Sequence, residues 1–232
     1  MSFAHFMELA LYDDPYGYYM TQAVASERSS PDRIGWGGDF YTAPELSPIL
    51  AKTLVRQIVD IDTQLGHPDP FTFLEIGGGN GTFAVDFLQE CRTIVPDLFN
   101  RLSYLIAERS PHLQSRQSIR LKEGIGNWVE GHVKWRASIE EIASDSLTGV
   151  CFSNELVDAL PVHRVRWQNN QMCEICVAYE GGHFVECLGQ CSTPKLAKYI
   201  DKHKVSLSEG QTTELHIEAE AWMKDVARVL HC

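Results

Sequence analysis

The sequence predicts an α/β fold, in which a parallel sheet carries helices on both faces. Three observations predict it. An apolar run over residues 71–76 reads as a buried strand. A turn with four glycines follows at 77–81, and helical periodicity resumes at residue 82. Three more apolar segments, at 103–108, 133–135 and 149–153, follow with helical stretches between them.

The remaining segments agree with this fold. Ser2 is a suitable cap for an amphipathic helix over residues 2–11, and Thr42 and Ser47 are possible starts for the helix at 49–64. From residue 162 to 188 the pattern changes to an antiparallel meander. The expected helices cover 49–64, 82–91, 111–121, 196–203 and 213–230, and the expected meander strands cover 162–167, 172–178 and 183–188.

The glycine turn indicates a nucleotide-like ligand. The spacing Glu75-x-Gly77-x-Gly79-x-Gly81, completed by Gly78 and Asn80, is typical of S-adenosylmethionine (AdoMet) methyltransferases. The dinucleotide-binding spacing G-x-G-x-x-G/A is met when it is counted from Gly79, because Ala84 then takes its last position. NAD therefore stays an alternative cofactor. An acid at the end of the second strand typically binds ribose hydroxyls, and Glu108 has that place.

Composition narrows the possible partners. A net charge of −11 argues against non-specific binding of nucleic acid and favours a cationic partner. No apolar run is long enough to span a membrane, and acids near the N-terminus argue against a signal peptide. Seven scattered cysteines fit a reduced compartment. The sequence shows no transit peptide, so we expect a bacterial cytoplasm, or the mitochondrial matrix if the protein is eukaryotic. The oligomeric state is not predicted.

Two other groups of residues are candidates for function. The loop at 35–48 combines glycines, an acid and aromatics, which is typical of a binding element as well as of a loop packed by its own rings. Cys173, Cys176, Cys187 and Cys191 have zinc-like spacing. The expected strand places Cys173 and Cys176 on opposite faces, so no metal site is predicted.

Four blocks of sequence, taken together, resemble the MidA family of AdoMet-dependent methyltransferases. They are residues 3–19, 37–45, 75–81 and 154–161, in the family's order and over essentially the whole chain. The family includes a mitochondrial complex I assembly factor that methylates a protein arginine. The resemblance implies a Rossmann-like class I methyltransferase sheet with an N-terminal helical cap and an inserted β-meander.

The resemblance also assigns roles to residues. It implies that the glycine turn and Glu108 bind AdoMet, that Asn154 and Glu155 lie where the methyl group is delivered, and that the 38–42 loop closes over the site. It implies four segments: a cap with substrate-side helices at 1–66, an AdoMet-binding core at 67–161, a meander at 162–192 and a helical segment at 193–232. The cofactor residues are Glu75, Gly77, Gly78, Gly79, Asn80, Gly81, Glu108 and Asn154, and the loop residues are Gly38, Asp39, Phe40 and Thr42.

One departure concerns the C-terminus. In the family, the helix expected at 213–230 leads into a further strand, and more strands follow. The chain stops at Cys232. The sequence therefore predicts a core shortened at its C-terminus, with one side of the sheet either unpaired or covered by something else.

The predicted function is methyl transfer to a protein side chain, an arginine guanidinium being favoured. Carboxylates can bind the planar guanidinium fork, and we expect Glu155 and Asp158 to share one side of a helical turn and form that grip. Asp158 and Asn154 have a structural alternative as caps of the turn before Pro161. Two other functions stay open: a non-catalytic AdoMet-binding assembly factor and an NAD-dependent oxidoreductase.

Overall fold

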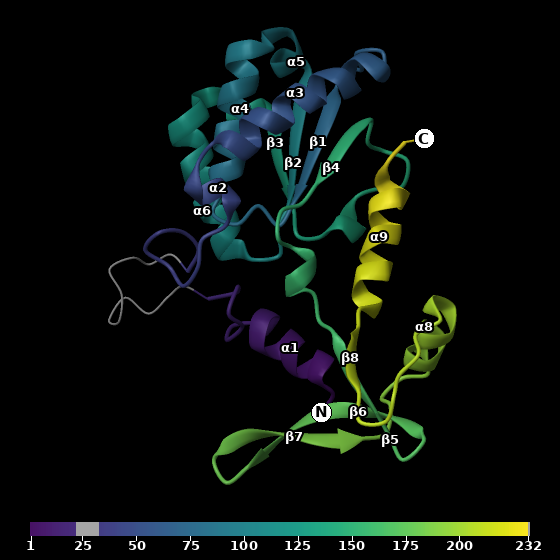
Figure 1. Ribbon diagram of the computed structural model, residues 1–232. Coiled ribbons are helices and arrows are strands. Elements are labelled where there is room, and N and C mark those ends of the chain that lie inside the picture. Colours follow the sequence, from purple (N-terminus) through teal and green to yellow (C-terminus); the bar gives the residue numbers. More distant parts are fainter. Residues whose placement is uncertain (22–32, 232) are drawn as a thin grey trace. The chain divides into compact units, whose positions relative to one another are not determined.

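The computed structural model describes residues 1–21 and 33–231 of the chain, which form two compact units. Unit 1 comprises Met1–Tyr18 and Val157–Lys224, and unit 2 comprises Tyr19–Leu156 and Asp225–Cys232. This division differs from the four segments expected from the sequence, because residues 1–66 are shared between the two units. Each unit has its own four-stranded sheet (Figure 1).

Unit 2 contains the parallel sheet, with strand order β3-β2-β1-β4. Strand β1 is central, and its six residues are all buried, which explains the apolar run that predicted it. Parallel pairing aligns the carboxyl ends of β1, β2 and β3, so Ile76 lies beside Ala107 and Ala107 beside Arg136. The strands are β1 (Phe71–Ile76), β2 (Leu102–Ala107), β3 (Val133–Arg136) and β4 (Gly149–Phe152).

Helices α3, α4 and α6 cover one face of this sheet, because their buried residues form a single cluster with alternate residues of β1 and β2. Phe73 is at the centre of this cluster, with its ring centroid 4.3 Å from that of Phe87 and 5.3 Å from that of Tyr104. The helices and turns of unit 2 are α2 (Ala43–Leu46), α3 (Ile49–Gln64), α4 (Thr82–Ile94), α5 (Pro96–Arg101), α6 (Pro111–Ile125), η1 (Gly126–Trp128), α7 (Val129–His132) and η2 (Ile139–Glu141).

The strands and helices of unit 2 follow the sequence prediction closely. Strand β1 and helix α3 have the expected bounds. Pro96 begins the short helix α5, where it takes the first helical position that suits proline. Asp62 of α3 accepts a bidentate pair of hydrogen bonds from Arg101 of α5, at 2.8 and 3.2 Å, and so ties the two helices together.

Unit 1 contains the antiparallel sheet, with strand order β7-β6-β5-β8. The predicted meander is confirmed as three strands joined by two-residue turns, at Asn169–Asn170 and at Gly181–Gly182, whose four residues all have positive φ. The strands are β5 (His163–Gln168), β6 (Gln171–Glu180), β7 (His183–Gly189) and β8 (Thr212–Leu215), and the helices are α1 (Phe3–Tyr12), η3 (Val157–Ala159), α8 (Lys195–His203) and α9 (Ile217–Val229).

The prediction of one helix over residues 213–230 is wrong at its start. Residues Thr212–Leu215 form β8, which pairs with β5, and α9 begins only at Ile217. The two threonines at the start of β8 are β-branched and suit a strand, and Leu215 is buried beside Val165 in the core of unit 1. Burial of Leu215 from a strand, rather than from a helix face, overrides the helical period.

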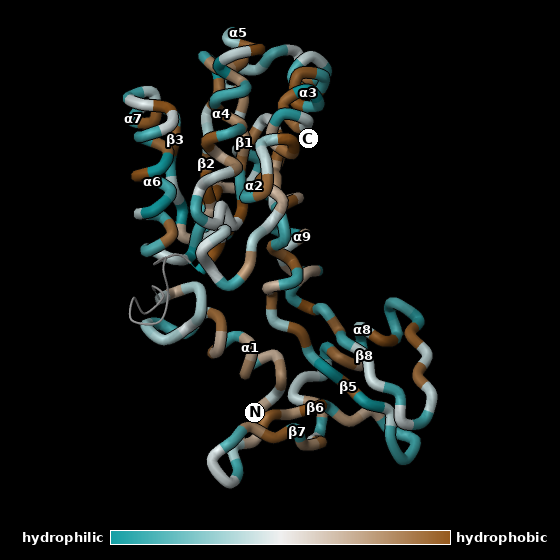
Figure 2. The backbone as a smooth tube through the Cα atoms, turned by 60° about the vertical axis from the view of Figure 1, so that its left-hand side comes forward, coloured by the Kyte–Doolittle hydropathy of each residue, from teal (hydrophilic) through white to brown (hydrophobic). Residues whose placement is uncertain are grey.

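The core of unit 1 is small. Val165, Leu196 and Leu215 are almost fully buried and form its centre beneath α8. On the other face of the sheet, α1 packs its Phe6 ring against Phe184 at a centroid distance of 5.0 Å. Figure 2 shows mostly hydrophobic stretches along β6 and β7 of this sheet.

Strand β4 has one strand partner in the described residues, β1. Near its start, Leu147 forms an isolated bridge with Leu230, at the end of the chain segment that returns to unit 2. Among the described residues, no helix is both long enough and apolar enough to cross a membrane.

Candidate AdoMet-binding site

The glycine turn at 77–81 connects β1 to α4 in a conformation that side chains would oppose. Gly77, Gly79 and Gly81 have φ values of +73°, +53° and +88°, in the left-handed region that favours glycine. The amide of Gly77 donates to the carbonyl of Ala107, which anchors the turn to the end of β2. The sequence prediction of a strand, glycine turn and helix is therefore confirmed.

The glycines of this turn have different surroundings. A Cβ at Gly77 would lie 2.8 Å from Leu156, and one at Gly81 would lie 3.1 Å from the Cα of Gln117. A Cβ at Gly78 would lie 3.2 Å from the amide nitrogen of Gln117. At Gly79 the nearest described atom is 3.8 Å away, on Ile34. A Cβ would therefore press on side chains at 77 and 78 and on backbone at 81, whereas the turn is most open at Gly79.

Glu108 lies directly after β2, where the sequence predicted an acid for ribose hydroxyls. Its Oε1 accepts from the amide of Ser110 at 3.0 Å, and its Oε2 accepts from Nε2 of Gln117 at 3.1 Å. Burial raises the pKa of Glu108 to about 7, against the lowering effect of these two hydrogen bonds. Burial therefore favours the protonated carboxyl group, which can donate a hydrogen bond as well as accept one.

Gln117 of α6 connects Glu108 to the glycine turn. Its side chain is fully buried. Nε2 donates to the carbonyl of Gly79 at 2.8 Å as well as to Glu108, and Oε1 accepts from the indole nitrogen of Trp135 at 2.9 Å. The side-chain amide of Gln117 thus fixes the distance between the glycine turn after β1 and Glu108 after β2. Its hydrogen bond with Trp135 also ties it to β3.

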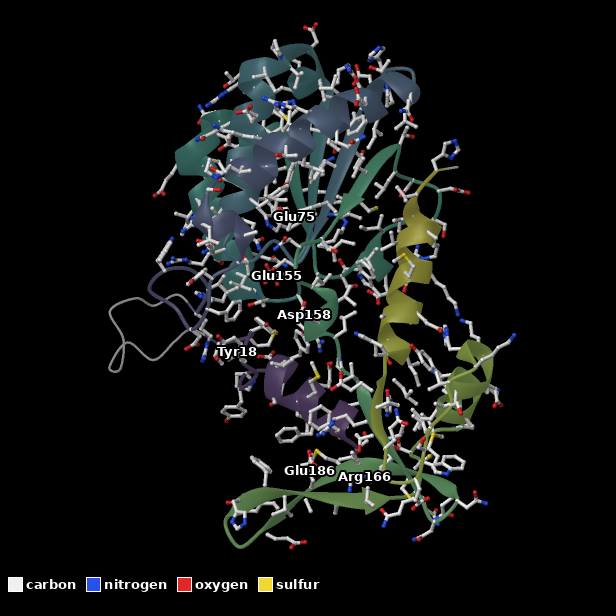
Figure 3. All side chains as sticks on the ribbon, viewed as in Figure 1. Tyr18, Glu75, Glu155, Asp158, Arg166 and Glu186 are labelled. Atoms are coloured by element: carbon white, nitrogen blue, oxygen red, sulfur yellow. The ribbon has the colours of Figure 1, made fainter. Side chains whose placement is uncertain are left out.

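Glu75 is the acid inside β1, and Figure 3 labels it. It is buried on the face of the sheet that carries Tyr104, whose hydroxyl donates to Oε2 of Glu75 at 2.7 Å. Burial raises the pKa of Glu75 to about 7, with a smaller contribution from the charge of Glu108 and an opposing one from Tyr104. Glu75 and Glu108 therefore form a pair of buried carboxyl groups beside the glycine turn.

Asn80, a predicted cofactor residue, makes structural hydrogen bonds. Its Oδ1 accepts from the hydroxyl of Thr82 at 2.8 Å and from Arg120 at 2.8 Å, which stabilises the first turn of α4. Its Nδ2 donates to the carbonyl of Ile34 at 3.3 Å. Asn80 therefore joins the glycine turn to the loop that precedes α2.

That loop contains the four predicted closing residues. The amide of Gly38 donates to Gly35 and that of Asp39 to Arg33, so the backbone folds back on itself. Phe40 is exposed and its carbonyl accepts from the amide of Gly35, while Thr42 precedes α2 at its N-cap. Through Ile34, the loop lies beside Gly79 and Asn80.

The predicted catalytic residues follow β4. Asn154 Nδ2 donates to Oε1 of Glu155 at 3.3 Å. Glu155 is exposed and has a φ of +49°, which is uncommon for a residue with a side chain. Figure 3 labels Glu155 and Asp158.

The prediction that Glu155 and Asp158 share one helical turn is wrong. The 3₁₀ turn η3 begins only at Val157, so Glu155 is not part of it, and Val157 is also where unit 1 resumes. The positive φ of Glu155 turns the chain before a helix can start. The i, i+3 geometry therefore does not place these two carboxylates together.

Sequence reasoning missed three members of the site: Tyr104, Gln117 and Trp135. Each lies inside an ordinary strand or helix, and no local motif marks it. Only the parallel register and the packing of α6 bring Gln117 between the turn and Glu108. The described residues contain no group of three or more His, Cys, Asp or Glu side chains that could hold a metal ion.

The chain matches one protein-family model over residues 53–232, and that family is described as "Putative S-adenosyl-L-methionine-dependent methyltransferase". Among curated proteins, it is 28% identical to the mitochondrial protein arginine methyltransferase NDUFAF7 homolog of Drosophila melanogaster, over 75% of this chain and 40% of that protein. It is also 28% identical to mitochondrial NDUFAF7 of Xenopus tropicalis, over 77% of this chain and 43% of that protein.

Among solved structures, the chain resembles a Burkholderia thailandensis protein bound to S-adenosyl-homocysteine. The TM-score is 0.80 at 29% identity, covering 99% of this chain and 55% of that one. A native structure from the same organism has a TM-score of 0.75 at 28% identity. The chain therefore spans about half the length of the relatives it matches. The agreement of the family model with the strand–glycine turn–helix unit shows that the chain belongs to the MidA family of AdoMet-dependent methyltransferases.

Proposed function

We propose that this chain forms the AdoMet-binding part of a methyltransferase that acts on a protein side chain, with an arginine guanidinium as the favoured acceptor. The observation that carries the proposal is the buried network in which Gln117 holds Glu108 at a fixed distance from the open turn at Gly79. The arginine acceptor is supported by the names of the curated relatives and by the net charge of −11, which suits a cationic partner.

The residues around the turn fit such a cofactor. Glu108 has two oxygens with acceptor capacity left beyond their present partners, as required for a pair of ribose hydroxyls. Gly79 offers backbone that a ligand can approach without meeting a Cβ. When bound, AdoMet supplies a methyl group on a sulfonium, which passes to a nucleophile aligned with the breaking bond.

We assign the acceptor side to Glu155. Its exposed carboxylate can accept two parallel hydrogen bonds from a guanidinium, which orients one nitrogen for attack. A backbone outlier at the end of a core strand is a feature that often accompanies function. Asn154 supports the carboxylate through its hydrogen bond to Oε1. Asp158 is assigned no role, because its expected grip with Glu155 rested on a helical turn that does not include Glu155.

A binding experiment tests the cofactor. Thermal shift and calorimetry with AdoMet, S-adenosyl-homocysteine and NAD should show binding of the first two and none of NAD. Glu108→Ala should abolish that binding, whereas Glu123→Ala, which removes an exposed glutamate of α6, should not. Binding of NAD alone would refute the proposal.

A transfer experiment tests the catalytic assignment. With radiolabelled AdoMet, an arginine-containing peptide and a matched lysine peptide are compared as acceptors. Glu155→Gln should lose transfer and keep cofactor binding. Asp145→Asn is the matched control, because Asp145 is also exposed and also has a positive φ, of +52°. Undiminished transfer by Glu155→Gln would contradict the assignment.

The non-catalytic alternative predicts a different outcome. An AdoMet-binding assembly factor would bind the cofactor with the same dependence on Glu108 but would label no acceptor. It is favoured by one observation, that the helical grip expected of Glu155 and Asp158 does not form.

We propose a bacterial cytoplasm as the compartment, since the solved relatives come from Burkholderia thailandensis.

A further inference from the structure

Four cysteines of unit 1 have no part in the proposed function, and two of them face each other. Cys176 of β6 and Cys187 of β7 are direct partners in the antiparallel register. Partners in such a register place their side chains on the same face of the sheet. Glu174 of β6, two residues from Cys176, is on that face too, buried and hydrogen-bonded to His163 at 2.7 Å.

The sulfur of Cys176 reaches across to the neighbouring strand. It lies 3.1 Å from the position that a Cβ would take at Gly189, which is two residues beyond Cys187 on the same face of β7. Glycine at 189 therefore leaves the space that this sulfur occupies. The Cys187 side chain is exposed on the partner strand, and both thiols are free.

The backbone holds this pair in register. Val177 exchanges two hydrogen bonds with Met1 on the edge of β6 away from β7. The neighbouring Cys176 therefore directs its backbone groups toward β7, which makes Cys176 and Cys187 a hydrogen-bonded pair. Cα atoms in such pairs are about 5.5 Å apart, within the usual Cα range for a disulfide, whereas their Cβ atoms are also about 5.5 Å apart and must move about 1 Å closer for the bond to form.

We propose that Cys176 and Cys187 are a thiol modification site, which a peroxide oxidises to a disulfide linking β6 to β7. The Cys187 thiolate attacks the peroxide, an S–O bond forms, the O–O bond breaks and water leaves. Cys176 then attacks the sulfur of Cys187, an S–S bond forms and the S–O bond breaks. The released oxygen and the two thiol protons complete the second water, so two thiols are oxidised and one peroxide is reduced.

The order of attack follows from exposure. Burial raises the pKa of the Cys176 thiol, and the charges of Glu174 and Cys187 raise it further. Cys187, which is exposed, therefore meets the oxidant first, and Cys176 resolves the sulfenic acid. The zinc-like spacing is thereby explained differently: Cys173 lies on the opposite face of β6, and Cys191 lies beyond the end of β7.

The sequence permits an unambiguous test. The full chain is treated with hydrogen peroxide, alkylated and digested with trypsin and a glutamate-specific protease without reduction. Cleavage after Arg166, Glu174, Glu180, Glu186 and Lys195 separates the cysteines: Cys173 lies in residues 167–174, Cys176 in 175–180, and Cys187 with Cys191 in 187–195. We expect fragment 175–180 linked to 187–195, lighter by two hydrogens than the sum, and released by a thiol reductant.

Matched variants identify the partner. Cys187→Ser should abolish the link, whereas Cys191→Ser, in the same fragment, and Cys173→Ser, on the same strand, should retain it. Because Cys187 is exposed, its serine variant should fold normally, which circular dichroism checks. A link that survives Cys187→Ser, or overoxidation of Cys187 with Cys176 still alkylated, would overturn the proposal.

Discussion

The pair of buried carboxyl groups beside the glycine turn makes the stability of this chain depend on pH. A carboxyl whose pKa is raised by folding binds more protons in the native state than in the unfolded one. Such a group therefore does not reduce the free energy of unfolding well below its unfolded pKa, and it reduces that free energy increasingly as pH rises toward its folded pKa. For Glu75 the two values are 4.5 and about 7, so this window lies between them.

The magnitude follows from the two values. A pKa of about 7 in place of 4.5 corresponds to a loss of about 3 kcal/mol of stability once pH exceeds both values. Between about pH 5.5 and pH 8, ionisation of Glu75 lowers the free energy of unfolding by about 2 kcal/mol. Glu108, whose pKa is also raised to about 7, contributes with the same sign.

Glu75→Gln removes one of these two ionisations. The Gln oxygen can still accept from Tyr104, while the buried amide needs a new partner, so absolute stability is a poor measure. The pH dependence of stability is the better measure, because it reports the ionisation of Glu75 directly. We expect the free energy of urea unfolding to fall between about pH 5.5 and pH 8 by about 2 kcal/mol less in Glu75→Gln than in the wild type.

Two variants sharpen this test. Tyr104→Phe removes the hydrogen bond that lowers the pKa of Glu75, so its stability should continue to fall at a higher pH than in the wild type. Glu123→Gln, at an exposed position of α6, should leave the pH dependence unchanged. If Glu75→Gln and the wild type lose equal stability over this range, Glu75 is not protonated by burial and the reasoning fails.

Three further predictions concern the site and its support. Gln117→Leu removes the hydrogen bonds that Gln117 makes to the carbonyl of Gly79 and to the indole of Trp135, so calorimetry should show the affinity for S-adenosyl-homocysteine lowered about tenfold or more. The control Gln114→Leu should have a small effect, because it loses only a hydrogen bond to the backbone oxygen of Glu108. Gly81→Ala should destabilise more than Gly66→Ala in urea unfolding, because both glycines have positive φ but only Gly81 lies against Gln117; equal losses would leave conformation alone as the cause. Arg101→Met leaves buried Asp62 with His67 as its remaining partner, so unfolding should show a loss of about 2 kcal/mol at neutral pH that shrinks in acid as the carboxylate protonates; a loss independent of pH would point to packing instead.

Local pattern predicted most of the secondary structure. Strand β1 and helix α3 have their expected bounds, because an apolar run and a helical period depend on neighbours in the sequence. The glycine turn and Glu108 were also visible, since strand ends and glycines carry a direct backbone signal. The start of the last helix was missed because β8 is held by its partner β5, and strand pairing is not a local property.

The sequence alone thus determined that a glycine turn follows β1 and that an acid follows β2. Only the tertiary structure decided how these parts are held. Gln117 is one polar residue among several on α6, and only packing selects it to join Gly79, Glu108 and Trp135. Burial, which depends on the whole fold, then raises the pKa values of Glu75 and Glu108. The same reason explains why the i, i+3 spacing of Glu155 and Asp158 was misleading: a positive φ at one residue ended the helical geometry that the spacing assumed.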